Sequence, residues 1–283
     1  MRTLLFLGIS LGALASLNAC SSSDSNANGD AGPGGNGGKD AGGGTVTLPD
    51  GAVVENDSSV PVHNDGPLVT YGDTYSGGEF HLGPVDYDET QWHNACAPQT
   101  KYASSIRQME GNLLAGLWNG IPNVADYCDS CIYVTTAKGK KAMLRVVTFG
   151  DTSKNSIDVS PEAFAILDTG EYPRSMSFQF AKCPDTGKIV YEFQTGSSEY
   201  WTSFWLRNAR VPIKKVEVQS ANHPSFIALD RNTDGTLNDA SGFGKGDFKI
   251  KITGIDGSEV IDNVAWPAGG IAGQTITGQG NFP

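Results

Sequence analysis

After Pro67 the chain is a succession of short runs of Val, Ile, Thr and aromatic residues, separated by clusters of Gly, Asp, Asn and Pro. Runs of this kind, bounded by turn-forming residues, are typical of β-strands. The clearest are CIYVTTA, KAMLRVVTF, SMSFQFAKC, KIVYEFQT, KKVEVQS and FKIKITGI, which begin at residues 131, 141, 175, 188, 214 and 248. The pattern predicts an all-β body of about 215 residues, enough for two modest domains or one large one.

Two segments have helical patterns instead. In SPEAFAILD, residues 160–168, Ser160 is a suitable N-cap, Pro161 suits the first helical position and Glu162 suits the first turn. The segment SSIRQMEGNLLAGLWNG, residues 104–120, contains a second predicted helix. Both would be short additions to a β-rich body.

The segment SSEYWTSFWLRN, residues 197–208, concentrates aromatic side chains on one predicted strand. Neighbouring side chains on a strand point to opposite faces. One face is apolar and is predicted to be buried, with Phe204 and Leu206 on it. The other face alternates aromatic and polar residues, Trp201, Ser203, Trp205 and Arg207. Because half of this second face is polar, we expect its two tryptophans to be exposed.

The first 19 residues have the pattern of an export signal. Arg2 precedes an apolar run, residues 4–17, that is too short to span a bilayer as a helix and ends in small residues. The closing LNAC resembles a bacterial lipobox, which implies a lipidated Cys20; an ordinary signal peptide is the alternative. Ser21 after this cysteine favours the outer membrane by the same resemblance. We therefore expect an exported chain that is lipid-anchored to the cell envelope or secreted.

Residues 20–66 consist mainly of Gly, Asp, Asn and Ser and have little apolar surface to bury. Such a segment is predicted to be a flexible tether without regular structure. The whole chain has a formal net charge of −11, which excludes the basic surface typical of nucleic-acid-binding proteins and leaves neutral polymers as partners. We expect a monomer that meets the membrane only through its lipid anchor.

Besides Cys20 the chain has four cysteines, Cys96, Cys128, Cys131 and Cys183. An even number in an exported chain favours two structural disulfides. The CxxC spacing of Cys128 and Cys131 also occurs in zinc and redox sites. A zinc site would need a second close pair or nearby histidines, and a thioredoxin-like site would need a βαβ context that is missing. Disulfides are therefore predicted, with all three pairings open on spacing alone.

Several motifs occur in an order that resembles the expansins, particularly the bacterial expansin-like proteins, over nearly the whole of residues 68–283. They are YSGGEF at 75–80, VTFGD at 147–151, SIDVSPEAFAIL at 156–167, GSSEYWTSFWLRNARVPIKKVEV at 196–218, FKIKITGIDG at 248–257 and the closing GQGNFP. The resemblance implies a six-stranded double-psi β-barrel at 67–186, followed by an immunoglobulin-like β-sandwich carbohydrate-binding domain at 187–283. It also implies the disulfides Cys96–Cys128 and Cys131–Cys183.

Asp158 in SIDVSP matches the best-defined barrel residue of this family. In the related inverting endoglucanases the equivalent aspartate is the general acid, and inverting hydrolysis needs a second carboxylate about 6.5–9.5 Å away. Expansins resemble these enzymes but lack that base, which implies a non-hydrolytic protein. The family usually has an aspartate where this chain has Phe149, and Asp151 is the candidate replacement. Without the resemblance, Asp158 would be interpreted as a residue that ties a loop.

The resemblance also identifies candidate sugar contacts. Thr70 and Tyr71 are the nearest candidates for a polar groove residue of the family. Tyr200 and Trp201 match paired aromatics that stack on glucan rings in bacterial expansins, and an aromatic ring offers a sugar a large apolar face. No aromatic stands at the family's third platform position. We expect Trp205 to supply that contact.

A calcium-loop pattern stands where the third platform aromatic is missing. DRNTDGTLNDAS, residues 230–241, follows the template D-x-[DN]-x-[DN]-G. The candidate ligands are Asp230, Asn232, Asp234, Thr236 and Asn238. The glutamate of the template's twelfth position is absent, and a hairpin turn explains the same residues. Both interpretations stay open: no cofactor is required, and a structural calcium ion is the single candidate.

These observations predict an exported protein that binds and loosens cell-wall β-glucan, such as cellulose, without hydrolysis. One alternative is an envelope enzyme that cleaves glycans with the same barrel, of endoglucanase or peptidoglycan lytic transglycosylase type. Another is a module that only binds. The four histidines, His63, His81, His93 and His223, are scattered, and those outside the tether are expected on the surface or in loops.

Overall fold

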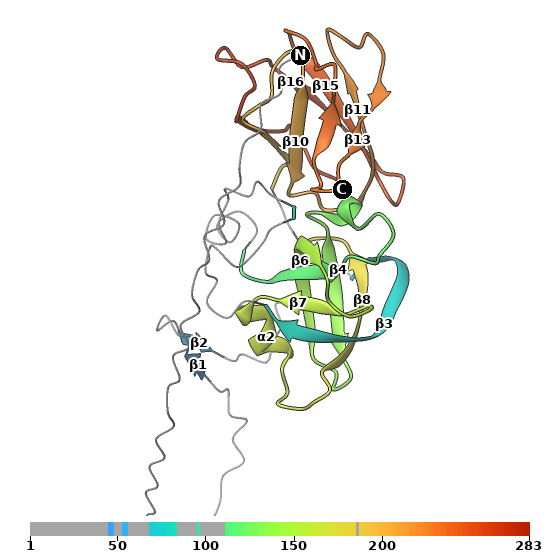
Figure 1. Ribbon diagram of the computed structural model, residues 1–283, viewed down its shortest axis with the longest axis vertical. Coiled ribbons are helices and arrows are strands. Elements are labelled where there is room, and N and C mark those ends of the chain that lie inside the picture. The colour runs from blue at the N-terminus through green and yellow to red at the C-terminus, as the bar shows by residue number, and fades with distance from the viewer. Residues whose placement is uncertain (1–44, 48–52, 56–67, 84–94, 97–110, 185–186) are drawn as a thin grey trace, which may run out of the picture. The chain divides into compact units, whose positions relative to one another are not determined.

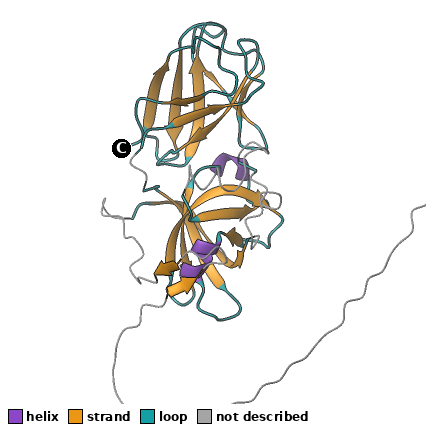
Figure 2. Cartoon of the chain, turned by 90° about the vertical axis from the view of Figure 1, so that its left-hand side faces the viewer, coloured by secondary structure: helices purple, strands orange, loops and turns teal. Residues whose placement is uncertain are grey.

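The computed structural model describes residues 45–47, 53–55, 68–83, 95–96, 111–184 and 187–283. Residues 43–283 form one compact unit in which strands predominate and helices are short (Figure 2). The predicted signal peptide and Cys20 lie outside the described residues. Within the predicted tether, β1 (Thr45–Thr47) and β2 (Val53–Glu55) pair antiparallel, a short ladder that the composition does not predict.

Six strands close into a barrel in the order β3-β7-β4-β6-β5-β8 (Figure 1). They are β3 (Thr70–Leu82), β4 (Leu114–Trp118), β5 (Cys131–Thr136), β6 (Lys141–Gly150), β7 (Ile157–Val159) and β8 (Ser175–Ala181). The pairs β3–β7 and β4–β6 are parallel, and the other neighbours are antiparallel. The core contains Leu117, Ile132, Leu144 and Phe178, all fully buried. The predicted six-stranded barrel is thereby confirmed.

The helix predicted at 160–168 is present, and the one predicted within 104–120 is wrong where that segment is described. α2 (Pro161–Leu167) is capped by Ser160, whose hydroxyl accepts a hydrogen bond from the Ala163 amide. A single 3-10 turn, η1 (Val124–Tyr127), is the other described helical element. Residues 114–118 form β4 instead. The prediction failed because a short apolar run that is buried on both sides has no periodicity that distinguishes a strand from a buried helix. None of the described helices is long and apolar enough to cross a membrane.

The rest of the chain forms two antiparallel sheets around a second core, which confirms the predicted β-sandwich. One sheet has the order β13-β14-β10-β9-β17, and the other has the order β12-β11-β15-β16. The first comprises β9 (Val190–Phe193), β10 (Thr202–Arg207), β13 (Asp230–Arg231), β14 (Leu237–Asp239) and β17 (Thr275–Thr277). The second comprises β11 (Ile213–Gln219), β12 (Ile227–Ala228), β15 (Phe248–Gly254) and β16 (Glu259–Val264). Tyr191, Phe204 and Phe248 are among the core side chains that both sheets bury.

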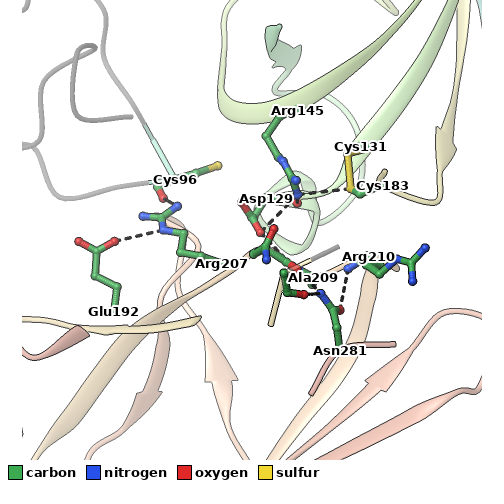
Figure 3. A network of polar contacts seen from close by, with 12 residues as sticks. Cys96, Asp129, Cys131, Arg145, Cys183, Glu192, Arg207, Ala209, Arg210 and Asn281 are labelled. Atoms are coloured by element: carbon green, nitrogen blue, oxygen red, sulfur yellow. Dashed lines mark hydrogen bonds and ion pairs between the residues drawn. A yellow bond between two sulfur atoms is a disulfide. The ribbon is translucent and has the colours of Figure 1, made fainter. Parts of the chain in front are cut away.

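The disulfides Cys96–Cys128 and Cys131–Cys183 are both present, in the pairing that the resemblance implied. A buried polar network adjoins them (Figure 3). Arg145 Nη1 donates to the Asp129 carbonyl at 2.7 Å and lies 3.3 Å from Cys183 Sγ. The Asp129 carboxylate accepts a hydrogen bond from the Ala209 amide at 3.3 Å. This last hydrogen bond joins residues on both sides of residue 187, the predicted boundary between the two β domains.

Candidate functional site

Asp158 occupies the middle of β7, between two fully buried residues. Ile157 and Val159 belong to the barrel core, so the side chain of Asp158 lies on the outer face of the barrel. β7 ends at Val159 and is followed directly by Ser160, whose buried hydroxyl caps α2 and also accepts a hydrogen bond from the Leu114 amide of β4 at 3.2 Å. One serine thus fixes the end of the strand that carries the carboxyl group.

The loop before β7 is hydrogen-bonded to β3. Ser156 Oγ accepts a hydrogen bond from the Glu79 amide at 3.0 Å, and Asn155 Nδ2 donates to the Ser76 carbonyl at 2.8 Å. At Gly78 a Cβ atom would lie 2.0 Å from the Asn155 carbonyl oxygen, so no side chain fits there. This close approach holds β3 and β7 in their register.

Four residues form a row across adjacent strands on the outside of the barrel. His81 of β3 and Gly116 of β4 are the Cα partners of Asp158, and Thr148 of β6 is the partner of Gly116. Residues paired in this way point to the same face. A Cβ atom on Gly116 would lie 2.8 Å from Thr148 Cγ2 and 3.8 Å from Asp158 Cβ. Because Gly116 has no side chain, the Thr148 side chain can lie against β4 next to the Asp158 carboxyl group.

The carboxyl group of Asp158 is half-buried and has no hydrogen-bond partner within the described residues. Burial raises the pKa of Asp158 above its usual value, and the nearby His81 opposes this shift. A carboxyl group that is more easily protonated can donate as well as accept hydrogen bonds. The group is therefore suited to contact a sugar hydroxyl, and a raised pKa also suits a general acid.

Sequence reasoning did not identify His81 and Thr148 as members of this row. We predicted a histidine on the surface or in a loop, and it lies on the outer face of β3, opposite Asp158. The sequence signal was the alternation of apolar Phe80 with polar His81, which indicates a strand with His81 on its outer face. His223 lies in a loop, as predicted, with Nε2 2.7 Å from Asp239 Oδ2. His63 and His93 lie outside the described residues.

The candidate second carboxylate, Asp151, follows the end of β6. It is exposed and accepts a hydrogen bond from Asn119 Nδ2. Two residues, Phe149 and Gly150, separate it from Thr148 of the row, and the two Cα atoms would be about 10 Å apart if the strand continued to Asp151. Phe149, which stands where the family usually has an aspartate, packs against the barrel core. The row itself therefore contains one carboxylate.

Thr70 and Tyr71 lie at the start of β3, eleven and ten residues before His81. Tyr71 packs against the cores of both the barrel and the sandwich, and burial raises the pKa of its phenol. Within the described residues, no hydrogen bond or ion pair joins Thr70 or Tyr71 to Asp158. The structure thus gives Tyr71 a packing role at this position, apart from the row.

A second cluster of candidate residues lies in the turn before β10. Tyr200 is 75% exposed and Trp201 is half-buried. Because β10 begins only at Thr202, the alternation of a regular strand does not apply to these two residues. An isolated bridge pairs Trp201 with Ser198, so the segment turns back on itself. Both aromatics are therefore presented by a turn, and Tyr200 meets solvent.

Neighbouring loops hold this turn, which we call the aromatic turn (residues 198–201). The Gly244 amide donates to the Glu199 carbonyl at 2.9 Å. Asn222 Nδ2 donates to the Ser241 and Gly242 carbonyls at 3.0 and 2.9 Å, and lies 3.4 Å from the Glu199 carbonyl. At Gly242, φ is +68° and a Cβ atom would lie 2.4 Å from the Glu199 carbonyl oxygen. The exposed ring thus stands on a closely packed backbone.

The prediction that Trp205 is exposed is wrong. Phe204 and Leu206 are in the core as predicted, but Trp205 is only 4% exposed on the opposite face. Its indole Nε1 donates to the Asp234 carbonyl at 3.0 Å. The alternating polar residue Arg207 is buried as well, because Glu192 and the Cys96 carbonyl bind its guanidinium at 3.1 and 2.7 Å (Figure 3). Polar residues therefore did not indicate an exposed face here.

The candidate calcium ligands belong to a hairpin. Asp230 is in β13 and Asn238 is in β14, and the two are Cα partners. Asp234 Oδ1 accepts hydrogen bonds from the Thr236 amide and hydroxyl at 3.0 and 2.6 Å, and Asn232 Nδ2 donates to that hydroxyl. Among the described residues, no group of three or more His, Cys, Asp and Glu side chains is placed to hold a metal ion. The hairpin-turn interpretation accounts for this geometry.

Comparison with known proteins points to one family, although no family model matches the chain. The chain is 25% identical over 224 residues to expansin YoaJ of Bacillus subtilis (strain 168), which covers 78% of this chain and 87% of that protein. It is 29% identical over 140 residues to expansin-like protein 6 of Dictyostelium discoideum, 46% of this chain and 48% of that protein.

Two solved structures share the fold. The apo expansin of Clavibacter michiganensis aligns with a TM-score of 0.58 at 19% identity, and covers 74% of this chain and 98% of its own. A point mutant of that expansin in complex with cellohexaose aligns with a TM-score of 0.56 at 19% identity, and covers 72% of this chain and 96% of its own.

Proposed function

We propose that this chain, which is similar to expansins over most of its length, binds and loosens cell-wall β-glucan without hydrolysing it. The observation that carries this proposal is the aromatic turn, with its exposed Tyr200 beside Trp201. An aromatic face gives the C–H face of a sugar a large apolar contact. The turn's backbone is held by Asn222 and Gly242, so little ordering entropy would be lost on binding.

The barrel row supports a non-hydrolytic role for the groove. Asp158 offers a half-buried carboxyl group without a partner within the described residues, flanked by His81 and by Thr148 beyond Gly116. These groups can exchange hydrogen bonds with glucan hydroxyls. Inverting hydrolysis also needs a base about 6.5–9.5 Å from the acid. The row holds no second carboxylate, and Asp151 is directed to Asn119.

A glycan-cleaving enzyme is the second candidate function, and one observation favours it. The raised pKa of Asp158 is what a general acid requires. Asp151, which directly follows β6, is the residue that would have to activate water. On this hypothesis Asp158→Asn and Asp151→Asn would each abolish sugar release, whereas a binding-only protein would release none.

The test is to mix the full chain with cellulose, xylan, chitin and peptidoglycan, and to measure bound protein and soluble sugar in the same tubes. We expect binding to cellulose without sugar release, and loosening of cellulose fibres in an extension assay. The Tyr200→Ala/Trp201→Ala double variant should lose most of the binding. Tyr172→Ala is the matched control, because Tyr172 is 77% exposed but lies on the barrel between α2 and β8.

Two results would count against this proposal. Equal binding by wild type and the double variant would remove the aromatic turn from the site. Release of oligosaccharides or muropeptides by wild type, lost in Asp158→Asn, would replace the proposed function with the enzymatic one.

We place this activity outside the cytoplasm. The two disulfides are consistent with export. An acyl anchor on Cys20, with residues 20–66 as a tether, would let the β domains reach a polymer while the chain stays at the cell envelope. Lipidation of Cys20 is part of this proposal and has its own test below.

A further inference from the structure

Two bonded side chains, His223 and Asp239, lie beside the aromatic turn. His223 Nε2 is 2.7 Å from Asp239 Oδ2, and the two side chains are 16% and 5% exposed. The other carboxylate oxygen, Oδ1, accepts hydrogen bonds from the Ser241 amide and hydroxyl at 3.0 and 2.8 Å. The carboxylate thus joins the loop after β11 to the loop after β14. Of its three partners, only the imidazole is of a type that changes charge between about pH 5 and 8.

His223 belongs to a closed turn that also contains Asn222. The Ser220 amide donates to the His223 carbonyl at 2.8 Å, and the His223 amide donates back to the Ser220 carbonyl at 3.1 Å. The Asn222 amide donates to the Phe243 carbonyl at 3.2 Å. Because this turn is closed in both directions, the position of His223 constrains the position of Asn222, its neighbour in the chain.

Both members of the pair are connected to the aromatic turn. On the histidine side, Asn222 Nδ2 lies 3.4 Å from the Glu199 carbonyl, besides its two bonds to residues 241 and 242. On the aspartate side, Asp239 is the Cα partner of Thr202, whose hydroxyl donates to the Ser198 carbonyl at 3.1 Å. A change in the bond between the two side chains would therefore reach the backbone that presents the exposed tyrosine.

We propose that the His223–Asp239 pair positions the aromatic turn and makes glucan binding depend on pH, tighter with a protonated imidazole and weaker with a neutral one. An imidazolium donates a charge-assisted hydrogen bond to a carboxylate, which is about twice as strong as a bond between neutral groups. The ion pair is present at low pH and is lost as the pH rises through the range in which histidine side chains lose their proton. The choice of glucan rests on the proposed function, whereas the pair and its links to the turn do not.

The other charged groups around this loop are of types that keep their charge in that range. Lys245 and Glu199 form an exposed pair, with Nζ 3.4 Å from Oε1 and 76% of the lysine side chain exposed. Asp247 and Lys249 border the opposite side of the loop, at the start of β15. Lysine and carboxylate side chains do not ordinarily change charge between about pH 5 and 8. Among the described residues around this loop, a change in binding over this range therefore reports on His223.

The experiment is a set of cellulose-binding isotherms of the full chain at pH values from about 5 to about 8. We expect wild type to bind about two- to fivefold more weakly at the upper end, the difference between one charge-assisted and one neutral hydrogen bond. His223→Gln keeps an N–H donor without a titrating charge, so its affinity should not change over this range. His81→Gln is the matched comparison, because it removes the other described histidine, and the pH dependence of wild type should remain in it.

NMR of the isotopically labelled chain, without glucan, gives a second readout. The Gly244 amide, which donates to the Glu199 carbonyl at 2.9 Å, should shift with the same midpoint as the His223 ring in wild type. It should not shift in His223→Gln. In Asn222→Ala the His223 ring should still titrate, but the Gly244 shift should shrink, because the link between the loop and the turn is removed.

These two readouts separate this proposal from the proposed function. Cellulose binding of equal affinity at all these pH values, an unchanged pH dependence in His223→Gln, or the absence of the coupled Gly244 shift would each overturn the role of the His223–Asp239 pair. Absence of cellulose binding at every pH, with the coupled shift present, would overturn the proposed function and leave the control of the aromatic turn by this pair standing.

Discussion

Replacing each of two nearby tryptophans should have opposite consequences, although they lie four residues apart on the chain. Trp201 is half-buried in the aromatic turn, whereas Trp205 is only 4% exposed. Trp201→Ala should therefore reduce cellulose binding and change the free energy of unfolding little. Trp205→Ala should lower stability and leave the binding of each folded molecule unchanged.

The expected loss at Trp205 follows from its contacts. Truncating a buried tryptophan to alanine costs about 3–5 kcal/mol, from lost burial and the cavity left behind. Trp205 also donates to the Asp234 carbonyl, and its ring lies 5.9 Å from the Arg207 guanidinium. For a unit of this size, 1 kcal/mol shifts the melting temperature by about 2–4 °C, so we expect a decrease of about 6–20 °C. Trp205→Phe keeps most of the ring and loses the N–H group, so its decrease should be smaller.

The assay pairs thermal unfolding, followed by circular dichroism, with a cellulose pull-down at a temperature at which every variant is folded. Refutation would take one clear form. If Trp205→Ala lost cellulose binding while its melting temperature stayed that of wild type, Trp205 would belong to an exposed platform, as the alternation of the sequence predicts.

Three further changes test charged groups and the N-terminus. Burial raises the pKa of Asp158, so the folded state is favoured by the neutral carboxyl group, and this contribution is lost as the pH rises through the raised pKa. Asp158→Asn should therefore have a higher melting temperature than wild type at neutral pH. The difference in melting temperature should vanish in acid, below the usual aspartate pKa of 3.8. Arg207→Met removes the buried partner of Glu192 and should cost about 3–5 kcal/mol in urea unfolding, against under about 1 kcal/mol for the exposed Lys138→Met; equal losses would contradict the reasoning. Cys20→Ser should abolish a lipid mass increment seen by mass spectrometry and move the chain from the membrane to the soluble fraction.

Local patterns were sufficient to predict most of the barrel and sandwich strands. The runs that begin at Cys131, Lys141 and Phe248 became β5, β6 and β15 with nearly the predicted bounds. The Ser160 cap was predictable because an N-cap needs only its own helix. β4 could not be predicted in this way. Leu114–Trp118 is buried by β6 and β7, which come later in the chain, and the sequence of the segment itself shows no periodicity that would reveal this burial.

The candidate sites depended on pairings that a single segment does not contain. Asp158 was identified by resemblance, but its neighbour His81 comes from a strand 77 residues earlier, in a register set by Gly78 and the loop at Asn155. Trp205 was assigned to the wrong environment for the same reason. Its face looked half polar, but the polar Arg207 is neutralised by Glu192 of the adjacent strand. In the sequence, a strand face that carries a buried ion pair shows the same alternation of apolar and polar residues as a strand face that is exposed to solvent.

The two proposed glucan contacts share a principle of construction. In each, the functional group makes few or no bonds of its own, while small or polar neighbours hold its backbone: Ser160 on one side of Asp158, and Asn222 beside the aromatic turn. A group that is already hydrogen-bonded would have to give up that bond to bind a sugar, so leaving it unpartnered on a rigid backbone lowers the cost of binding. The same reasoning makes Asn222 and Ser160 informative targets. Replacing either residue should make the position of the neighbouring sugar-binding side chain less fixed, although that side chain itself is unchanged.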